Sequence, residues 1–241
     1  MNRLFVTGDV HGSLANGKQL SSEAFPAGKT LDRDDFVFIA GDFGCIWNNV
    51  PNAEEAYHLN WLSNKPWTTF VIGGNHENWP RLHALPREEA FGVSLGVIRP
   101  NVWFVPNGTV LTIAGSRIFV MGGAMSTDKM HRTQGVSWWP EEIPSVNEMN
   151  FGIDNLEKCN WEVDYVITHT MPTDDIAIFR DVMGVPWHWE KDRETDPTAK
   201  YLQHIAELLK YKKWYCGHFH VEQQFKYAHC LYKSVVRLNE V

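Results

Sequence analysis

Short apolar runs, each followed at once by glycine and polar residues, recur along the 241-residue chain. Continuous apolar runs of about 4–8 residues that are rich in β-branched and aromatic side chains are typical of strands buried on both faces. Six such runs predict strands: RLFVTGDVHG from Arg3, DFVFIAGDFG from Asp35, TTFVIGGNHE from Thr68, RIFVMGGAMS from Arg117, DYVITHTMP from Asp164 and KWYCGHFH from Lys213. The segment TVLTIAGSRIFV also predicts a hairpin that turns at Ala114-Gly115-Ser116.

Helical patterns occupy the intervals between these strands. Residues 52–65 predict one helix, and Asp196 followed by Pro197 forms an N-cap and N1 pair for another. Ser145 with Glu148 three residues later reads as a capping box. Strands that alternate with helices predict a mainly parallel α/β core that gives way to hairpins further along the chain. The length suits one domain over residues 1–241.

Composition and charge exclude several protein classes. A formal net charge of -7 argues against a generally basic surface that tracks nucleic acid, although a local cationic site is compatible with it. No apolar stretch approaches the roughly 20 residues that cross a bilayer, and the run from Arg3 lacks the features of an export signal. A cytoplasmic protein without membrane contacts is therefore expected. The four cysteines form no C-x-x-C pair, so a zinc ribbon or redox dithiol is not indicated.

The stretch YCGHFH, residues 215–220, places two imidazoles two residues apart after a glycine. In an extended chain, side chains at i and i+2 point the same way, so His218 and His220 are expected to face one object. Alone, the pair is compatible with a metal site, although such a pair is more often structural or exposed than ligating. The remaining ligands have to come from other segments.

Polar residues of metal-binding types follow five of the predicted strands: Asp9 and His11, Asp42, Asn75 and His76, His169, and His218 and His220. Ligands of open α/β sheets lie beyond the carboxyl ends of the strands, so these side chains are expected to converge. Carboxylate, imidazole and amide donors without thiolate favour Mn, Fe, Co or Zn over a structural zinc site. Singly, each residue also fits a turn or a hydrogen-bonded core position. The set in this order favours two ions and phosphoester hydrolysis.

The motifs GDVHG (8–12), GD (41–42), GNHE (74–77), His169 and GHFH (217–220) occur in an order that resembles the calcineurin-like metallophosphoesterase family over residues 8–220. The resemblance implies an α/β fold, a four-layer αββα sandwich of two mixed β-sheets flanked by helices. It implies that Asp9, His11 and His220 hold one divalent ion, that Asn75, His169 and His218 hold the other, and that Asp42 bridges them. It further implies that His76 hydrogen-bonds the phosphate or protonates the leaving oxygen. Glu77 is expected to be a structural acid beside this set.

The expected reaction is hydrolysis of a phosphomonoester or phosphodiester by a hydroxide that the two ions activate, with manganese expected to serve in vitro. A phosphorylated small molecule or nucleotide is favoured as substrate over a phosphoprotein. The reason is that Gly41-Asp42 continues as Phe43-Gly44-Cys45, without the acidic residue and arginine of the protein Ser/Thr phosphatase branch. The acidic charge disfavours a nuclease. A catalytically silent protein-binding scaffold is disfavoured because adjacent buried carboxylates are costly without cations.

Two segments carry no motif. Residues 122–142 contain Arg132 and the pair Trp138-Trp139, which could grip a phosphate and stack on a base, or equally pair with acids and pack the loop. Residues 186–197 are aromatic and charged without periodicity, as in a lid or a surface excursion.

Overall fold

Strands that are buried along their whole length form the centre of the first sheet. The computed structural model describes residues 2–12, 18–184 and 196–239. The seven strands have the order β13-β1-β2-β3-β6-β5-β4. Their bounds are Leu4–Thr7 (β1), Phe36–Ala40 (β2), Thr68–Ile72 (β3), Arg87–Ala90 (β4), Val93–Arg99 (β5), Val102–Phe104 (β6) and Val235–Arg237 (β13). Strands β1, β2, β3 and β6 are parallel, and all residues of the first three are buried, as their apolar runs predict.

The second sheet has six strands in the order β11-β12-β10-β9-β8-β7. Their bounds are Thr109–Ile113 (β7), Ser116–Met121 (β8), Tyr165–Thr168 (β9), Lys213–Cys216 (β10), Gln223–Gln224 (β11) and His229–Cys230 (β12). Strands β8, β9, β10 and β12 are parallel. The predicted hairpin joins β7 to β8 through Ala114 and Gly115, both at positive φ, while Ser116 already pairs with Ile113. The turn is thus one residue shorter than expected, because two left-handed residues match the strand twist.

Five α-helices and three short 3-10 segments cover the sheets in the described residues. Their bounds are Ala53–Ser63 (α1), Trp79–His83 (α2), Val146–Lys158 (α3), Thr173–Met183 (α4), Pro197–Leu208 (α6), Pro26–Thr30 (η1), Lys129–His131 (η2) and Pro140–Glu142 (η3). The predicted caps are present. Ser145 and Glu148 form a reciprocal capping box on α3, and Asp196 accepts a hydrogen bond from the Thr198 N–H at 2.8 Å. Helices α2 and α4 were not anticipated from the sequence.

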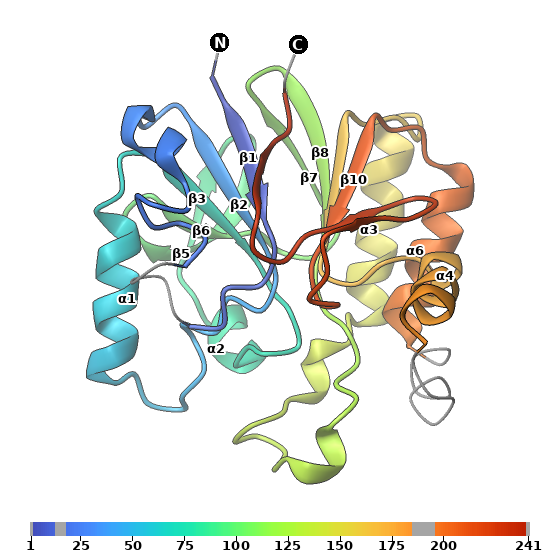
Figure 1. Cartoon of the computed structure of the whole chain (residues 1–241), viewed down its shortest axis with the longest axis horizontal. Coiled ribbons are helices and arrows are strands. Elements are labelled where there is room, and N and C mark those ends of the chain that lie inside the picture. The colour runs from blue at the N-terminus through green and yellow to red at the C-terminus, as the bar shows by residue number, and fades with distance from the viewer. Residues whose placement is uncertain (1, 13–17, 185–195, 240–241) are drawn as a thin grey trace.

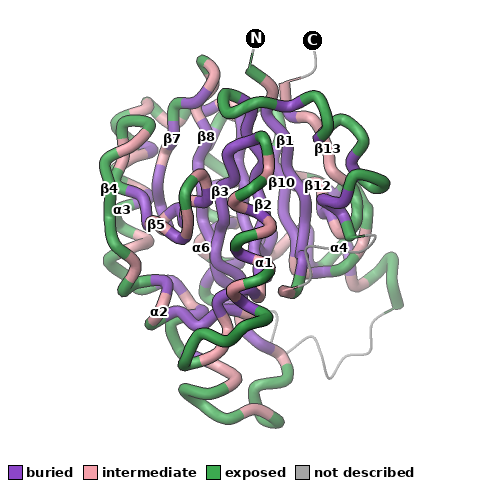
Figure 2. The backbone as a smooth tube through the Cα atoms, turned by 90° about the vertical axis from the view of Figure 1, so that its left-hand side faces the viewer, coloured by how far each residue is buried: buried purple, intermediate pink, exposed green. Residues whose placement is uncertain are grey.

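The elements stack as four layers, which confirms the predicted αββα sandwich. Helix α1 lies against the outer face of the first sheet, and α3, α4 and α6 cover the outer face of the second (Figure 1). The inner faces meet in one apolar layer that includes Val6, Phe38, Phe70, Val120 and Ile167. Buried backbone runs through the middle of the molecule, and exposed residues line its periphery (Figure 2). No helix among the described residues is both long and apolar enough to cross a membrane.

The sandwich brings the carboxyl ends of the parallel strands to one end of the molecule. Residues 122–142 leave the end of β8 and project from that same end, near α2 (Figure 1). Of segment 186–197, for which a lid or a surface excursion was expected, only Asp196 and Pro197 lie within the described residues.

Asp35, buried directly before β2, ties the first strand to the second. Its carboxylate accepts the Arg3 N–H at 2.7 Å and pairs with the Arg3 guanidinium at 2.5 Å. Burial alone would raise the pKa of Asp35, but the hydrogen bonds from Arg3 and Asp32 outweigh it and hold this pKa below its ordinary value. Asp35→Asn is therefore expected to lower the free energy of unfolding by about 1–3 kcal/mol at pH 7.

Because the folded pKa lies below the unfolded one, this stabilisation is present above about pH 4 and is lost as the pH falls through the folded value. Urea unfolding at pH 7 and pH 3 measures the difference in free energy of unfolding between wild type and Asp35→Asn. Asp34→Asn, at a neighbouring exposed position, is the control. An equal difference at both pH values would contradict the assignment.

Candidate metal centre

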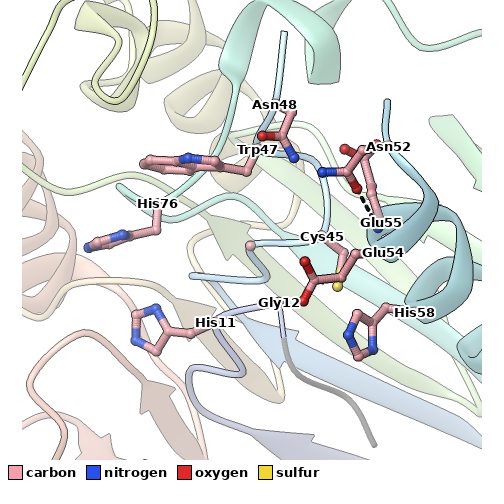
Figure 3. A pocket seen from close by; sticks show the side chains of 11 residues that line it. His11, Gly12, Cys45, Trp47, Asn48, Asn52, Glu54, Glu55, His58 and His76 are labelled. Atoms are coloured by element: carbon pink, nitrogen blue, oxygen red, sulfur yellow. Dashed lines mark hydrogen bonds between the residues drawn. The ribbon is translucent and has the colours of Figure 1, made fainter. Parts of the chain in front are cut away.

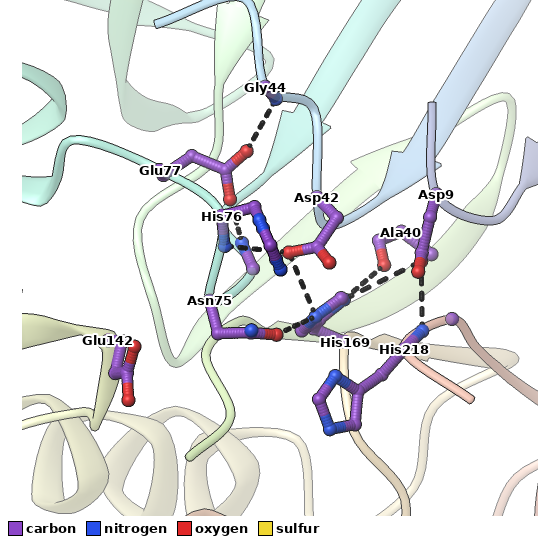
Figure 4. A network of polar contacts seen from close by, with 12 residues as sticks. Asp9, Ala40, Asp42, Gly44, Asn75, His76, Glu77, Glu142, His169 and His218 are labelled. Carbon is purple, nitrogen blue, oxygen red and sulfur yellow. Dashed lines mark hydrogen bonds and ion pairs between the residues drawn. The ribbon is translucent and has the colours of Figure 1, made fainter. Parts of the chain in front are cut away.

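The polar residues that follow β1, β2, β9 and β10 converge into two overlapping groups. Asp9, His11, Asp42 and His220 form one group, and Asp42, His169 and His218 form the other, with ligand atoms within 4.8 Å of one another in each. Asn75 adjoins the second group, since its Oδ1 lies 3.0 Å from Nε2 of His169 (Figure 4). All seven residues predicted as ligands therefore lie together, with Asp42 shared by both groups.

The backbone is strained where it presents these side chains. His11, Asp42, His218 and His220 have φ values of 47°, 44°, 68° and 54°. In this left-handed region the conformational free energy of a residue with a Cβ is higher by roughly 1–2 kcal/mol, and such strain is common at functional sites. The expectation that the last two histidines point the same way along an extended chain is wrong. The left-handed turns direct His218 to one group and His220 to the other.

Glycines next to the motif residues permit the close approach of these loops. A Cβ at Gly41 would lie 2.1 Å from Nδ1 of His169, and a Cβ at Gly217 would lie 2.2 Å from Oδ1 of Asp9. At Gly74 it would lie 2.2 Å from the backbone nitrogen of Asp42. These contacts are far below any tolerated Cβ distance, so packing requires all three glycines, and Gly41 is in addition at a φ of 88° that favours glycine.

Hydrogen bonds behind the cluster fix the orientation of its donors. Nδ1 of His169 lies 2.9 Å from the Ala40 carbonyl, so Nε2 is the ring nitrogen that faces Asn75 and Asp42. The Asn75 amide donates to Oγ of Ser126 at 3.2 Å, so its carbonyl oxygen turns toward His169. Metal-binding imidazoles are commonly held by such a carbonyl contact. Both orientations suit the donation of a lone pair to a cation.

Two buried carboxylates dominate the electrostatics. Asp9 and Asp42 are 1% and 2% exposed. Burial by itself raises the pKa of Asp42, yet the attraction of His169 and the other imidazoles holds it well below its ordinary value. Burial lowers the pKa of His169, but Asp42 and Asp9 overcome this and raise it to about 10. The surroundings of the carboxylates therefore favour positive charge at this point.

The donor set fits divalent metal ions. It contains carboxylate, imidazole and amide donors and no thiolate, as borderline and hard divalent ions prefer. The buried Oδ2 of Asp9 has no well-formed hydrogen bond within the described chain, although it lies 2.9 Å from Nε2 of His220 and 3.7 Å from Nε2 of His11. Three ligand-type atoms thus surround one point; the two imidazole nitrogens lie 2.9 Å apart in a hydrogen bond, and the carboxylate oxygen has no such bond.

His76 stands beside the cluster, in contact with an arginine from segment 122–142. Its backbone N–H donates to Asp42 at 2.8 Å, and its ring stacks on Trp47 with centroids 5.7 Å apart (Figure 3). Nη2 of Arg132 lies 3.0 Å from Nε2 of His76. A guanidinium only donates, so Nε2 is the acceptor. Burial first, then the Arg132 charge, lower the pKa of His76 despite the attraction of Asp42.

Of the two alternatives expected for segment 122–142, the contacts show the one in which its arginine pairs with an acid and its tryptophan packs the loop. Arg132 pairs with Asp128 at 2.7 Å, as in the packing interpretation, and still reaches the site. Its guanidinium carbon lies 6.0 Å from the centroid of Trp47. The tryptophan that packs here is Trp139, edge-on to Trp47 at 5.2 Å.

Nothing in the sequence indicated that Ser126 and Glu142 support the site, whereas Glu77 was expected to be a structural acid. Glu142 accepts hydrogen bonds from the N–H and Oγ of Ser126, each at 2.7 Å, and Ser126 in turn holds Asn75. Burial raises the pKa of Glu142 to about 6. No motif marks Ser126 and Glu142, because they lie 16 residues apart and Ser126 lies 51 residues from Asn75 along the chain. Glu77, expected to be a structural acid, is buried and accepts from the N–H groups of Gly44 and Gly74.

A sequence model described as calcineurin-like phosphoesterase matches residues 3–222. The chain is similar to a lariat debranching enzyme of Schizosaccharomyces pombe at 23% identity, with 91% of this chain and 48% of that protein covered. It is also similar to a lariat debranching enzyme of Danio rerio at 24% identity, with 91% of this chain and 40% of that protein covered. The chain thus spans about half or less of the length of these curated relatives.

Gly74→Ala is expected to displace Asp42, because the new methyl would lie 2.3 Å from Oδ1 of that carboxylate. We expect metal uptake to fall and stability to drop by about 1–3 kcal/mol, as for other overpacked sites. Metal content per chain after dialysis and the thermal midpoint measure the two effects. Gly115→Ala is the control for metal content, since nothing lies within 4 Å of its added Cβ and the strain from its positive φ falls in the β7–β8 turn, which carries no ligand-type residue of the centre. Equal metal content in both variants would contradict the packing argument.

Proposed function

We propose that this chain, which belongs to the calcineurin-like phosphoesterase family, uses two divalent ions to hydrolyse a phosphoester of a small molecule or nucleotide. The observation that carries the proposal is the pair of ligand groups that share Asp42. In this proposal Asp9, His11 and His220 hold one ion, Asn75, His169 and His218 hold the other, and Asp42 bridges them. Such ions, when bound, acidify water and neutralise charge on the phosphoryl oxygens.

Arg132 grips the phosphoryl group in this proposal. The side chain is 13% exposed and is anchored by Asp128, so its planar fork is already oriented. A phosphate anion competes with the neutral imidazole of His76 for this guanidinium, because charge-assisted hydrogen bonds are stronger. Arg132 would therefore supply the phosphate contact for which the Gly41-Asp42 motif offers no arginine.

His76 orients and protonates the leaving oxygen. Stacking on Trp47 fixes the plane of its ring, and the bond from its N–H to Asp42 fixes its backbone. When phosphate draws Arg132 away, Nε2 of His76 becomes free to carry a proton. A positioned imidazole of this kind typically contributes about 10²–10⁴-fold to such reactions.

Manganese is the ion we propose for assays in vitro, because the oxygen and imidazole donors suit it. A cytoplasmic location belongs to the same proposal. It is supported by the cysteines, since Cys45, Cys159, Cys216 and Cys230 are all free thiols, as a reducing compartment maintains.

Debranching of a lariat is a second candidate function, favoured by the two curated relatives that align with 91% of this chain. Both relatives are longer proteins, so their reaction does not transfer directly. Incubation of the manganese-loaded chain with a lariat-form oligonucleotide and its linear counterpart discriminates between the candidates. Cleavage confined to the lariat supports this second function.

The metal requirement tests the proposal. We expect wild type to hydrolyse bis(4-nitrophenyl) phosphate with added manganese and to lose turnover in EDTA. Asp42→Asn removes the carboxylate shared by both groups and is expected to reduce turnover by at least about 100-fold. Exposed Asp154→Asn serves as the matched control. Metal content below one ion per chain at saturation would favour the silent scaffold instead.

His76 and Arg132 are expected to act on the same phosphoryl group. We expect His76→Asn to lower kcat by about 100-fold at unchanged metal content, and Arg132→Gln chiefly to raise KM. Because the two residues touch, the double variant should lose less than the product of the single losses. Steady-state kinetics of the three variants measure this coupling.

His204→Asn, on the exposed side of α6, is the control for loss of a histidine. Unchanged turnover of metallated His76→Asn would show that the assigned role is wrong.

A further inference from the structure

Two separate cavities adjoin the candidate metal centre, and His11 is the lining residue that they share. The first, the tryptophan cavity, has a volume of about 370 Å³, and its lining includes His11, His76, Trp47, Asn48, Asn52 and His58 (Figure 3). The second, the lysine cavity, has a volume of about 460 Å³, and its lining includes Asp9, His11, Lys18, Gln19, Tyr232 and Lys233. Each is large enough for part of a small-molecule ligand.

The two cavities differ in charge. Glu54 and Glu55 line the tryptophan cavity, and both arginines that adjoin its lining in the described residues are engaged: Arg81 is bound to Glu55 at 2.5 Å, and Arg132 pairs with Asp128 and contacts His76. Its amides and indole suit an uncharged group that hydrogen-bonds and stacks. In the lysine cavity, Lys18 and Lys233 are exposed, and neither has a carboxylate partner among the described residues. Two ammonium groups beside a phosphoester site, without a carboxylate partner in the part of the chain that the structure describes, suit a second anionic group.

The loop that carries Tyr232 and Lys233 is held rigidly. One oxygen of Glu222 accepts the N–H groups of Tyr232, Lys233 and Ser234 at 3.1, 2.6 and 2.7 Å. The amide of Gln19 donates to the carbonyls of Tyr232, at 2.8 Å, and Asp9. The same loop packs against the N-terminal motif, since a Cβ at Gly8 would lie 2.1 Å from the Leu231 carbonyl oxygen.

This loop also contacts the metal centre directly. The Tyr232 ring stacks on the His220 ring with centroids 4.5 Å apart and planes 19° apart. Nζ of Lys233 lies 5.3 Å from the centroid of the same tyrosine. The lysine cavity therefore has a fixed wall that joins a cation, an aromatic ring and a candidate ligand.

We propose, resting on the function proposed above, that the substrate is a phosphodiester with unequal arms, an uncharged arm in the tryptophan cavity and an arm bearing a second phosphate in the lysine cavity. A monoester has a single arm and would use only one cavity. An oligonucleotide-like diester is the simplest substrate of this chemical class.

The positions of the residues also assign the bond that breaks. His76 lines the tryptophan cavity and not the lysine cavity. Water adds to phosphorus, the P–O bond to the uncharged arm breaks, and the leaving oxygen takes a proton from protonated His76. The proton that the water gives up on addition replaces the one lost by His76. The uncharged arm leaves as an alcohol, and the phosphorylated arm retains the new phosphomonoester.

Two chromogenic diesters that differ by one phosphate test the proposal. Thymidine 5′-(4-nitrophenyl phosphate) and its 3′-phosphorylated form share the scissile bond and leaving group. We expect manganese-loaded wild type to prefer the 3′-phosphorylated form by about 5-fold in kcat/KM, mainly through KM, as two partly exposed ion pairs allow. The preference should shrink as salt is raised, because exposed charges are screened.

Lys18→Gln/Lys233→Gln is expected to abolish this preference. Lys200→Gln/Lys213→Gln changes the net charge equally at two exposed positions that line neither cavity, and it should retain the preference. Equal kcat/KM for both diesters in wild type, or a preference that survives in Lys18→Gln/Lys233→Gln, would overturn the proposal while hydrolysis itself stands.

Binding provides a readout that is independent of turnover. Calorimetric titration with thymidine 3′,5′-bisphosphate in EDTA should give a Kd that rises about 5-fold in Lys18→Gln/Lys233→Gln, on the same estimate for two exposed ion pairs. An unchanged Kd would overturn the anion subsite. Absence of turnover of any diester, combined with lysine-dependent binding, would overturn the proposed hydrolysis and support the subsite.

Discussion

Two carboxylates that are buried side by side require positive charge close to them, and the site is arranged around this requirement. Asp9 and Asp42 have no lysine or arginine partner among the described residues, and the groups that face them are imidazoles. Buried charges without compensation cost several kcal/mol each. The imidazole rings that face the carboxylates provide this compensation, and their nitrogen atoms are of a type that can bind a cation. This arrangement distinguishes a metal centre from a structural ion pair.

The sandwich determines where this charge accumulates. In the first sheet Thr7 pairs with Ile39, so the loops that carry Asp9 and Asp42 leave the sheet side by side. In the second sheet Ile167 pairs with Tyr215, which brings His169 next to the loop of His218. Each ligand group combines residues from both sheets. The centre can therefore form only when the two sheets pack, and Gly41, Gly74 and Gly217 allow the final approach.

The net charge of the whole chain is a poor guide to the charge around the candidate metal centre. The chain is acidic overall, yet Arg132, Lys18 and Lys233 all lie close to the centre. A substrate anion responds to the charges within about 8–10 Å at ordinary ionic strength rather than to the sum over the chain. An acidic chain can therefore still attract an anionic phosphoester where its cationic side chains gather. They also provide a basis for choosing among substrates that share the scissile group.

The sequence by itself determined the six central strands, the capped helices and the metal-binding residue types at the strand ends. These features depend on local periodicity and on motifs such as GDVHG and GNHE. The resemblance of the motifs assigned His218 and His220 to different ions, but only the tertiary structure showed the left-handed φ at each residue that separates the two rings, with the His218 N–H donating to Asp9. The contacts of Arg132 with His76 and of Ser126 with Asn75, and the lysine cavity, join segments distant along the chain. No local pattern encodes such contacts, since they arise when separate loops fold onto one another.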